Sequence, residues 1–111
     1  MDPGNNRCQE GFETFDYQIK LLGEYLCAMG AKDVGWVCDG NQETPTKGWR
    51  QEWLPANKGL IDYQEIFKLL KQHKFQGPII QMPFYSRKTK EEFVDLVTKE
   101  LAYFKQCEKG G

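Results

Sequence analysis

Residues 52–80 read EWLPANKGLIDYQEIFKLLKQHKFQGPII, and this stretch carries the most informative secondary-structure signals of the chain. It predicts a loop, then an amphipathic helix, and then a strand that begins around Gly77-Pro78-Ile79-Ile80. Asp62 and Glu65 have the spacing of a capping box, in which each side chain binds the backbone amide of the other residue. The helix is therefore expected to begin at Asp62 and to run to about Lys74.

The segment before this stretch predicts a helix, a strand and a long loop. Apolar residues recur at helical spacing from about Glu13 to Ala28, which indicates a first helix. The small and apolar residues from Met29 to Val37 indicate a short buried strand. Residues 38–57 contain glycines and prolines and show no helical period. We expect a loop of about 20 residues there, and loops of that length are often functional.

The segment after this stretch predicts one more strand and one more helix. The strand covers Gly77 to Met82, and Pro83 is expected to end its regular pairing. Thr89 and Glu92 repeat the capping-box spacing at the start of a helix that runs to about Gln106. The expected order is helix, strand, helix, strand, helix, which is typical of parallel strands covered by helices. Two strands leave both sheet edges open, so a further segment or chain is expected to complete the sheet.

Composition limits the possible partners and location. The 111 residues form one domain with 40% hydrophobic residues, 28% charged residues and a net charge of −1. This charge gives no reason to expect a nucleic acid or an anionic membrane as partner. No segment is apolar enough for a membrane span or a signal peptide, so a cytoplasmic location is expected. The cysteines form no C-x-x-C pair, which argues against a zinc knuckle or a redox motif.

Several short motifs in sequence order resemble one enzyme family. They are Asp2-Pro3-Gly4-Asn5, Leu22-Gly23-Glu24-Tyr25, Ala31-Lys32-Asp33, Glu52-Trp53-Leu54-Pro55, Gly59-Leu60-Ile61-Asp62-Tyr63 and Phe75-Gln76-Gly77-Pro78. Together they are similar to the C-terminal part of the xylose isomerase-like sugar phosphate isomerases and epimerases. The likeness covers nearly the whole chain, from the end of barrel strand six through helix eight. It implies an α/β fold that is a partial (β/α)8 TIM barrel, with residues 1–111 forming its last two to three strand-helix units.

The resemblance also implies a sugar or sugar phosphate as substrate and a divalent metal (Mn, Mg or Co) as cofactor. A metal of this kind polarises the sugar oxygens while a carboxylate moves a proton. Asp2 matches the metal-binding aspartate of strand six, and Asn5 matches a substrate-contacting position. Gly30 stands where the family carries a histidine, and Gln81 or Phe84 stands where it carries a glutamate. We therefore expect no metal to be bound by this chain alone.

Other candidate residues have structural alternatives that the sequence leaves open. Asp2 is the candidate metal ligand, but it also suits a turn near the N-terminus. Lys32 and Asp33 are candidate substrate ligands at the end of a strand, or else form ion pairs and hydrogen bonds within the loop. Trp36, Trp49 and Trp53 could stack on a sugar ring, or else pack within the loop, and Trp36 and Trp53 are the candidate substrate-binding residues. His73 is expected to pack or to cap its helix rather than to catalyse.

Two functional hypotheses follow from these features. In the first, the chain is the C-terminal fragment of a sugar phosphate isomerase/epimerase-like protein of carbohydrate metabolism that is inactive alone. In the second, it is a non-catalytic module that binds a partner or assembles with itself through its open strand edges. Whether the chain is an enzyme is left open.

Overall fold

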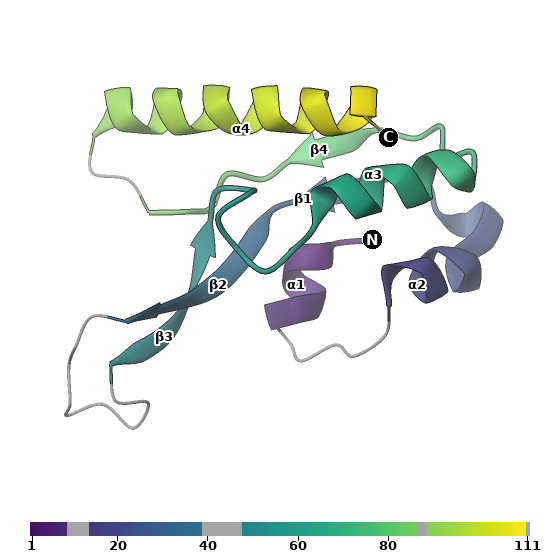
Figure 1. Ribbon diagram of the computed structural model, residues 1–111, viewed down its shortest axis with the longest axis horizontal. Coiled ribbons are helices and arrows are strands. Elements are labelled where there is room, and N and C mark those ends of the chain that lie inside the picture. Colours follow the sequence, from purple (N-terminus) through teal and green to yellow (C-terminus); the bar gives the residue numbers. More distant parts are fainter. Residues whose placement is uncertain (9–13, 39–47, 87–88, 111) are drawn as a thin grey trace.

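The computed structural model describes residues 1–8, 14–38, 48–86 and 89–110 of the chain. These residues form a small α/β domain (Figure 1). Its elements are, in chain order, α1 (Pro3–Cys8), α2 (Phe15–Leu22), a 3-10 helix η1 (Gly23–Tyr25), β1 (Met29–Ala31), β2 (Asp33–Cys38), β3 (Trp49–Leu54), α3 (Tyr63–Gln72), β4 (Ile79–Gln81) and α4 (Lys90–Gly110).

The parallel pairing expected from the alternating pattern is present between β1 and β4. Met29, Gly30 and Ala31 pair with Ile79, Ile80 and Gln81 in register. One face of this pair points into the core, because Met29 and Ala31 are completely buried. The other face carries Gly30 and Ile80, and Ile80 is 55% exposed. Residue 1 lies along the edge of β1, where its amino group donates to Ala28 O and its carbonyl accepts from Gly30 N–H.

The prediction of a loop over residues 38–57 is wrong for residues 49–54. These residues form β3, which pairs antiparallel with β2 from Asp33↔Leu54 to Cys38↔Trp49. The expected strand Met29–Val37 is in fact two strands, β1 and β2, that pair with different partners. The β2–β3 ribbon extends away from α3 and α4, while α1 contacts β2 (Figure 1). Residues 39–47 of the expected loop lie outside the described residues.

The helices pack on the buried face of the β1–β4 pair and on one another. Phe104 of α4 lies 5.0 Å from the ring of Tyr63 and 6.1 Å from the ring of Phe67, both centroid to centroid, and both partners belong to α3. Ile66 is completely buried in the same core. In Figure 1, α2 lies beside α3. This core supplies the hydrophobic stabilisation of the domain.

Side-chain caps begin three of the helices. Asp62 accepts the Glu65 amide at the start of α3, and Thr89 accepts the Glu92 amide at the start of α4, as the spacing predicts. Thr14 caps α2 in the same way. The expected helix Glu13–Ala28 is shorter than predicted, because α2 ends at Leu22, where Gly23 takes a positive φ of 52°. No helix within the described residues is long and apolar enough to cross a membrane.

Candidate functional site

The carboxyl ends of β1 and β4 carry charged and aromatic side chains that surround Lys32. Lys32 directly follows β1 and is only 4% exposed. Its Nζ lies 3.3 Å from Asp2 Oδ2, 4.4 Å from the ring centroid of Trp53 and 4.8 Å from that of Phe84. We call Asp2, Lys32, Trp53 and Phe84 the strand-end cluster. A carboxylate and the faces of two rings together compensate the ammonium group for its loss of water.

The backbone of Lys32 is held from both sides. The Tyr63 hydroxyl accepts the Lys32 amide at 2.9 Å and donates to the Lys32 carbonyl at 2.5 Å. Burial raises the pKa of Tyr63, so this hydroxyl stays protonated. On the other side, a Cβ on Gly4 would lie 2.7 Å from Lys32 Cγ. Only glycine at position 4 therefore allows α1 to approach Lys32 this closely.

Asp2 and Asn5 are brought together at the start of α1. Asp2 Oδ1 accepts the Asn5 amide and Asp2 Oδ2 accepts Asn5 Nδ2, each at 2.9 Å. Asp2 therefore forms a turn with Asn5, which agrees with the turn-forming role predicted as an alternative to metal binding. The Asp2 side chain is 26% exposed, so its carboxylate can accept a further hydrogen bond.

The donor set around Asp2 does not fit a divalent metal. A hard ion such as Mg²⁺ or Mn²⁺ needs several oxygen or imidazole ligands around it. Asp2 Oδ2 instead faces the Lys32 ammonium, whose charge repels a cation. Within the described residues no three His, Cys, Asp or Glu side chains come together as a metal site.

Asp33 lies next to Lys32 in sequence but outside the strand-end cluster. It is completely buried, and its carboxylate accepts the amides of Val34 at 2.8 Å, Ile61 at 3.1 Å and Gly59 at 3.2 Å. Burial raises the pKa of Asp33, while these amide hydrogen bonds oppose the rise. Asp33 was a candidate either for binding substrate or for hydrogen bonding within the chain. Its geometry fits the second role, because the buried carboxylate has no access to a substrate.

The two tryptophans predicted to stack on a sugar take different positions. Trp53 is half-buried against Lys32 in the strand-end cluster. Trp36 lies on the same face of the β2–β3 ribbon but farther out, and is 50% exposed. The structure therefore brings Asp2, Asn5, Lys32 and Trp53 together, while Trp36 lies beside this group and Asp33 lies away from it.

Phe84, rather than Gln81, shares the site with Lys32. Gln81 Nε2 donates to Val97 O at 3.1 Å and to Glu100 Oε1 at 2.9 Å, so its side chain points to α4. Phe84 follows β4 and lies over the Lys32 ammonium while remaining 57% exposed. The resemblance leaves both positions open as the substituted glutamate; in the structure, Phe84 lies at the strand-end cluster and Gln81 faces α4.

Sequence reasoning missed the buried carboxylate of Glu100, which lies in a helix segment rich in charged residues. Glu100 is 2% exposed, accepts the Ala56 amide at 2.7 Å and binds Gln81. Burial raises the pKa of Glu100 above its ordinary value of 4.5, although these hydrogen bonds oppose the rise. Burial and the Glu100 charge raise the pKa of the neighbouring Tyr85 to about 12. Among the described residues, the Tyr85 hydroxyl completes no hydrogen bond of ordinary geometry.

Glu100 is expected to make the folded state less stable as the pH rises. Its pKa is higher in the folded than in the unfolded chain, so its contribution is fully present below pH 4.5 and is lost as the pH rises through the folded pKa. Each unit of raised pKa corresponds to about 1.4 kcal/mol. In urea unfolding from pH 4 to pH 8, the wild type should lose stability relative to Glu100→Gln as the pH rises. A wild-type advantage that grows with pH would contradict this sign.

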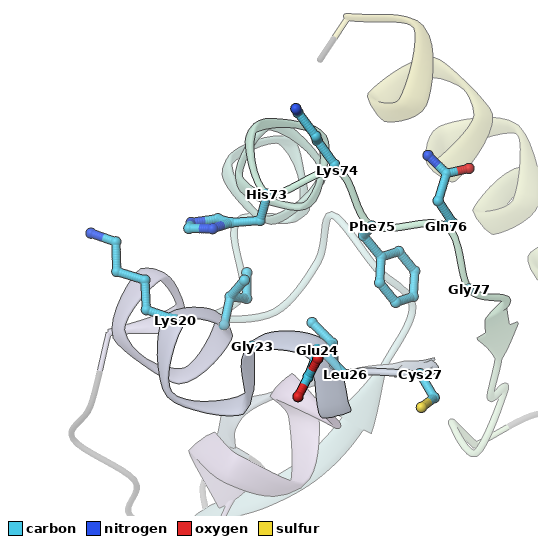
Figure 2. A pocket seen from close by; sticks show the side chains of 11 residues that line it. Lys20, Gly23, Glu24, Leu26, Cys27, His73, Lys74, Phe75, Gln76 and Gly77 are labelled. Carbon is cyan, nitrogen blue, oxygen red and sulfur yellow. The ribbon is translucent and has the colours of Figure 1, made fainter.

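A pocket lies at the opposite, amino-terminal ends of β1 and β4, between α2 and the end of α3. Ile19, Leu26, Phe75 and Gly77 contribute to its lining. Figure 2 shows the Phe75 ring pointing into this space, whereas Lys74 points away from it. At its margin, His73 Nε2 lies 3.1 Å from Asp16 Oδ1, joining the end of α3 to α2. The predicted structural role of His73 thus matches its position.

No family model matches this chain, and no curated protein sequence is similar enough to it to count as a relative. The likeness to sugar phosphate isomerases and epimerases therefore rests on the motifs quoted above and stays a prediction.

Proposed function

We propose that this chain is a sugar-binding module derived from a xylose isomerase-like barrel, and that it does not convert the sugar when it is alone. The observation that carries the proposal is the Lys32 ammonium held between two aromatic rings and a carboxylate. This group lies at the carboxyl ends of the parallel strands β1 and β4. In parallel α/β folds, ligands bind at these ends.

The exposed parts of the strand-end cluster suit a sugar. An aromatic ring face packs well against the C–H face of a sugar ring, and Phe84 offers such a face with 57% exposure. The partly exposed carboxylate of Asp2 can accept from a sugar hydroxyl. Lys32 has little access of its own, so it orders Asp2 and the rings rather than contacting the ligand first.

The residues at the two substituted positions support a binding role over a catalytic one. A Cβ on Gly30 would lie 2.5 Å from Met82 Sδ and 3.7 Å from Asp2 Oδ2, so a larger residue would fit beside the cluster only if the Met82 side chain moved. Glycine supplies no imidazole, and neither Gln81 nor Phe84 supplies a carboxylate. A proton transfer at carbon needs a positioned base, and the described part of the cluster contains only Asp2, which already pairs with Lys32.

The proposal predicts that Phe84→Ala weakens sugar binding about tenfold, which is the loss expected for one stacked ring. Phe84 is 57% exposed but its ring also covers the buried Lys32 ammonium, so the change should cost about 1 kcal/mol of stability and leave the chain folded. Binding of aldoses, ketoses and their phosphates would be followed by titration with amide NMR. Tyr17→Ala is the matched control, since Tyr17 is 55% exposed and lies on α2, outside the cluster. Shifts away from the cluster, or none at millimolar sugar, would refute the proposal, as would aldose–ketose conversion by the chain alone.

Self-association is the second candidate function. Within the described residues β4 pairs on one side only, and Ile80 on the uncovered face is 55% exposed. An open strand edge of this kind can pair with another chain. Sedimentation of the sugar-free protein distinguishes the candidates, because only self-association gives a mass above that of the 12.9 kDa chain.

A further inference from the structure

We propose that the tryptophan-bearing face of the β2–β3 ribbon extends the sugar site, so that the ligand is an extended, uncharged glycan chain rather than a single sugar. This inference rests on the proposed sugar-binding function. It is carried by the three tryptophans of the ribbon, which share one face and which we call the tryptophan ladder: Trp53, Trp36 and Trp49.

The strand register places the three rings at regular steps. Residues directly opposite in an antiparallel pair point to the same face, and every second residue along a strand shares that face. Trp53 is opposite Val34, Trp36 is opposite Gln51, and Trp49 is opposite Cys38. The tryptophans therefore follow one another at successive two-residue levels, about 7 Å apart along the ribbon. They alternate between the two strands.

The ladder becomes more accessible with distance from the strand-end cluster. Trp53 is half-buried beside Lys32, whereas Trp36 and Trp49 are 50% and 49% exposed. The first ring of the ladder thus belongs to the proposed sugar site, and the next two continue from it without interruption. A ligand that begins at Phe84 and Trp53 and grows along the ribbon would meet a further ring at each level.

Charge and polarity along the ladder favour a neutral glycan. Stacked bases of a single-stranded nucleic acid would need cations beside the rings. Among the described residues of this face and the adjoining cluster, the cation is Lys32, and Asp2 already neutralises it. The Arg50–Glu52 ion pair, at 2.8 Å, belongs to the opposite face. Gln51 lies between the rings, so apolar and amide surfaces alternate, which suits the C–H faces and hydroxyls of a sugar chain.

The test is a titration of glucose and its β-1,4-linked oligomers, from two to six units, into the full chain. We expect affinity to rise with length, by about tenfold for each further ring engaged. Trp49→Ala should keep the affinity for glucose and lose the last part of the gain, while Trp49→Tyr should restore it. Arg50→Ala is the matched control, because it changes the neighbouring residue on the opposite face, and it should bind like the wild type.

The possible results separate this inference from the function on which it rests. Equal affinity for glucose and for the hexamer would overturn the glycan ladder and leave the sugar site in place. A length-dependent gain that Trp49→Ala leaves unchanged would overturn it as well. No binding of any saccharide would refute the proposed function itself. A dimer in sedimentation that Trp49→Ala abolishes would assign the ladder to a second copy of this chain instead.

Discussion

Asp33→Ala is expected to lower the free energy of unfolding by about 3–5 kcal/mol, since it leaves the amides of Val34, Gly59 and Ile61 without their acceptor. All three bonds end at a carboxylate that is completely buried. An unsatisfied buried donor costs about 1–3 kcal/mol, and removal of the buried charge offsets part of the total. The loss is a large share of the stability of a domain of this size. Urea unfolding followed by circular dichroism measures it.

The matched control is Asp62→Ala, which makes the same chemical change at an exposed position. Asp62 accepts one amide, that of Glu65, at the start of α3. Loss of such a cap costs about 1 kcal/mol. If the two variants lost equal stability, the three buried hydrogen bonds of Asp33 would contribute no more than one exposed cap. It would then be wrong to infer that Asp33 holds residues 59–61 against β2.

Phe104→Ala is expected to lower the free energy of unfolding by about 3–5 kcal/mol through the cavity it leaves between α3 and α4. The Phe104 ring is 6% exposed and contacts the rings of Tyr63 and Phe67. Tyr63 also holds the backbone of Lys32, so loosening this packing should disturb the strand-end cluster as well. Thermal and urea unfolding report the stability, and the amide NMR signal of Lys32 reports the cluster.

Leu101→Ala provides the control on the same helix. Leu101 lies less than one turn before Phe104 but is 42% exposed, so its loss should cost less than 1 kcal/mol. Comparable destabilisation by both variants would mean that helix propensity, rather than packing of the Phe104 ring, holds α4 in place. If Phe104→Ala shifted only the amide NMR signals of α4, the expected effect of this packing on the strand-end cluster would be wrong.

The helix starts were predictable because their signals are local. Asp62 and Thr89 each lie three residues before the amide they accept, and the structure shows both bonds. The short apolar run around Ile79 likewise predicted β4, whereas the run from Met29 to Val37 predicted one strand and forms both β1 and β2. The parallel pairing of β1 and β4 followed from the helix between them, since chain topology leaves few other arrangements.

β3 was not predictable in the same way. The segment Trp49–Leu54 carries an arginine, a glutamine and a glutamate, and its flanking glycine and prolines favoured a loop. It forms a strand because the preceding strand β2 supplies a partner for its backbone groups, and a residue pattern within 49–54 does not reveal that partner. Strand propensity depends on such neighbours more than helix propensity does.

Local sequence signals were enough to predict where α3 and α4 begin, that Met29 and Ile79 lie in strands, and which residue types were available for a sugar site. The folded chain was needed to show that Lys32 lies between Trp53 and Phe84, and that Asp33 and Glu100 are buried acceptors of backbone amides. The difference follows from how far apart in the sequence the interacting residues lie. A cap or an apolar stripe involves residues a few positions apart, whereas the partners of a buried charge come from segments that meet only when the chain folds.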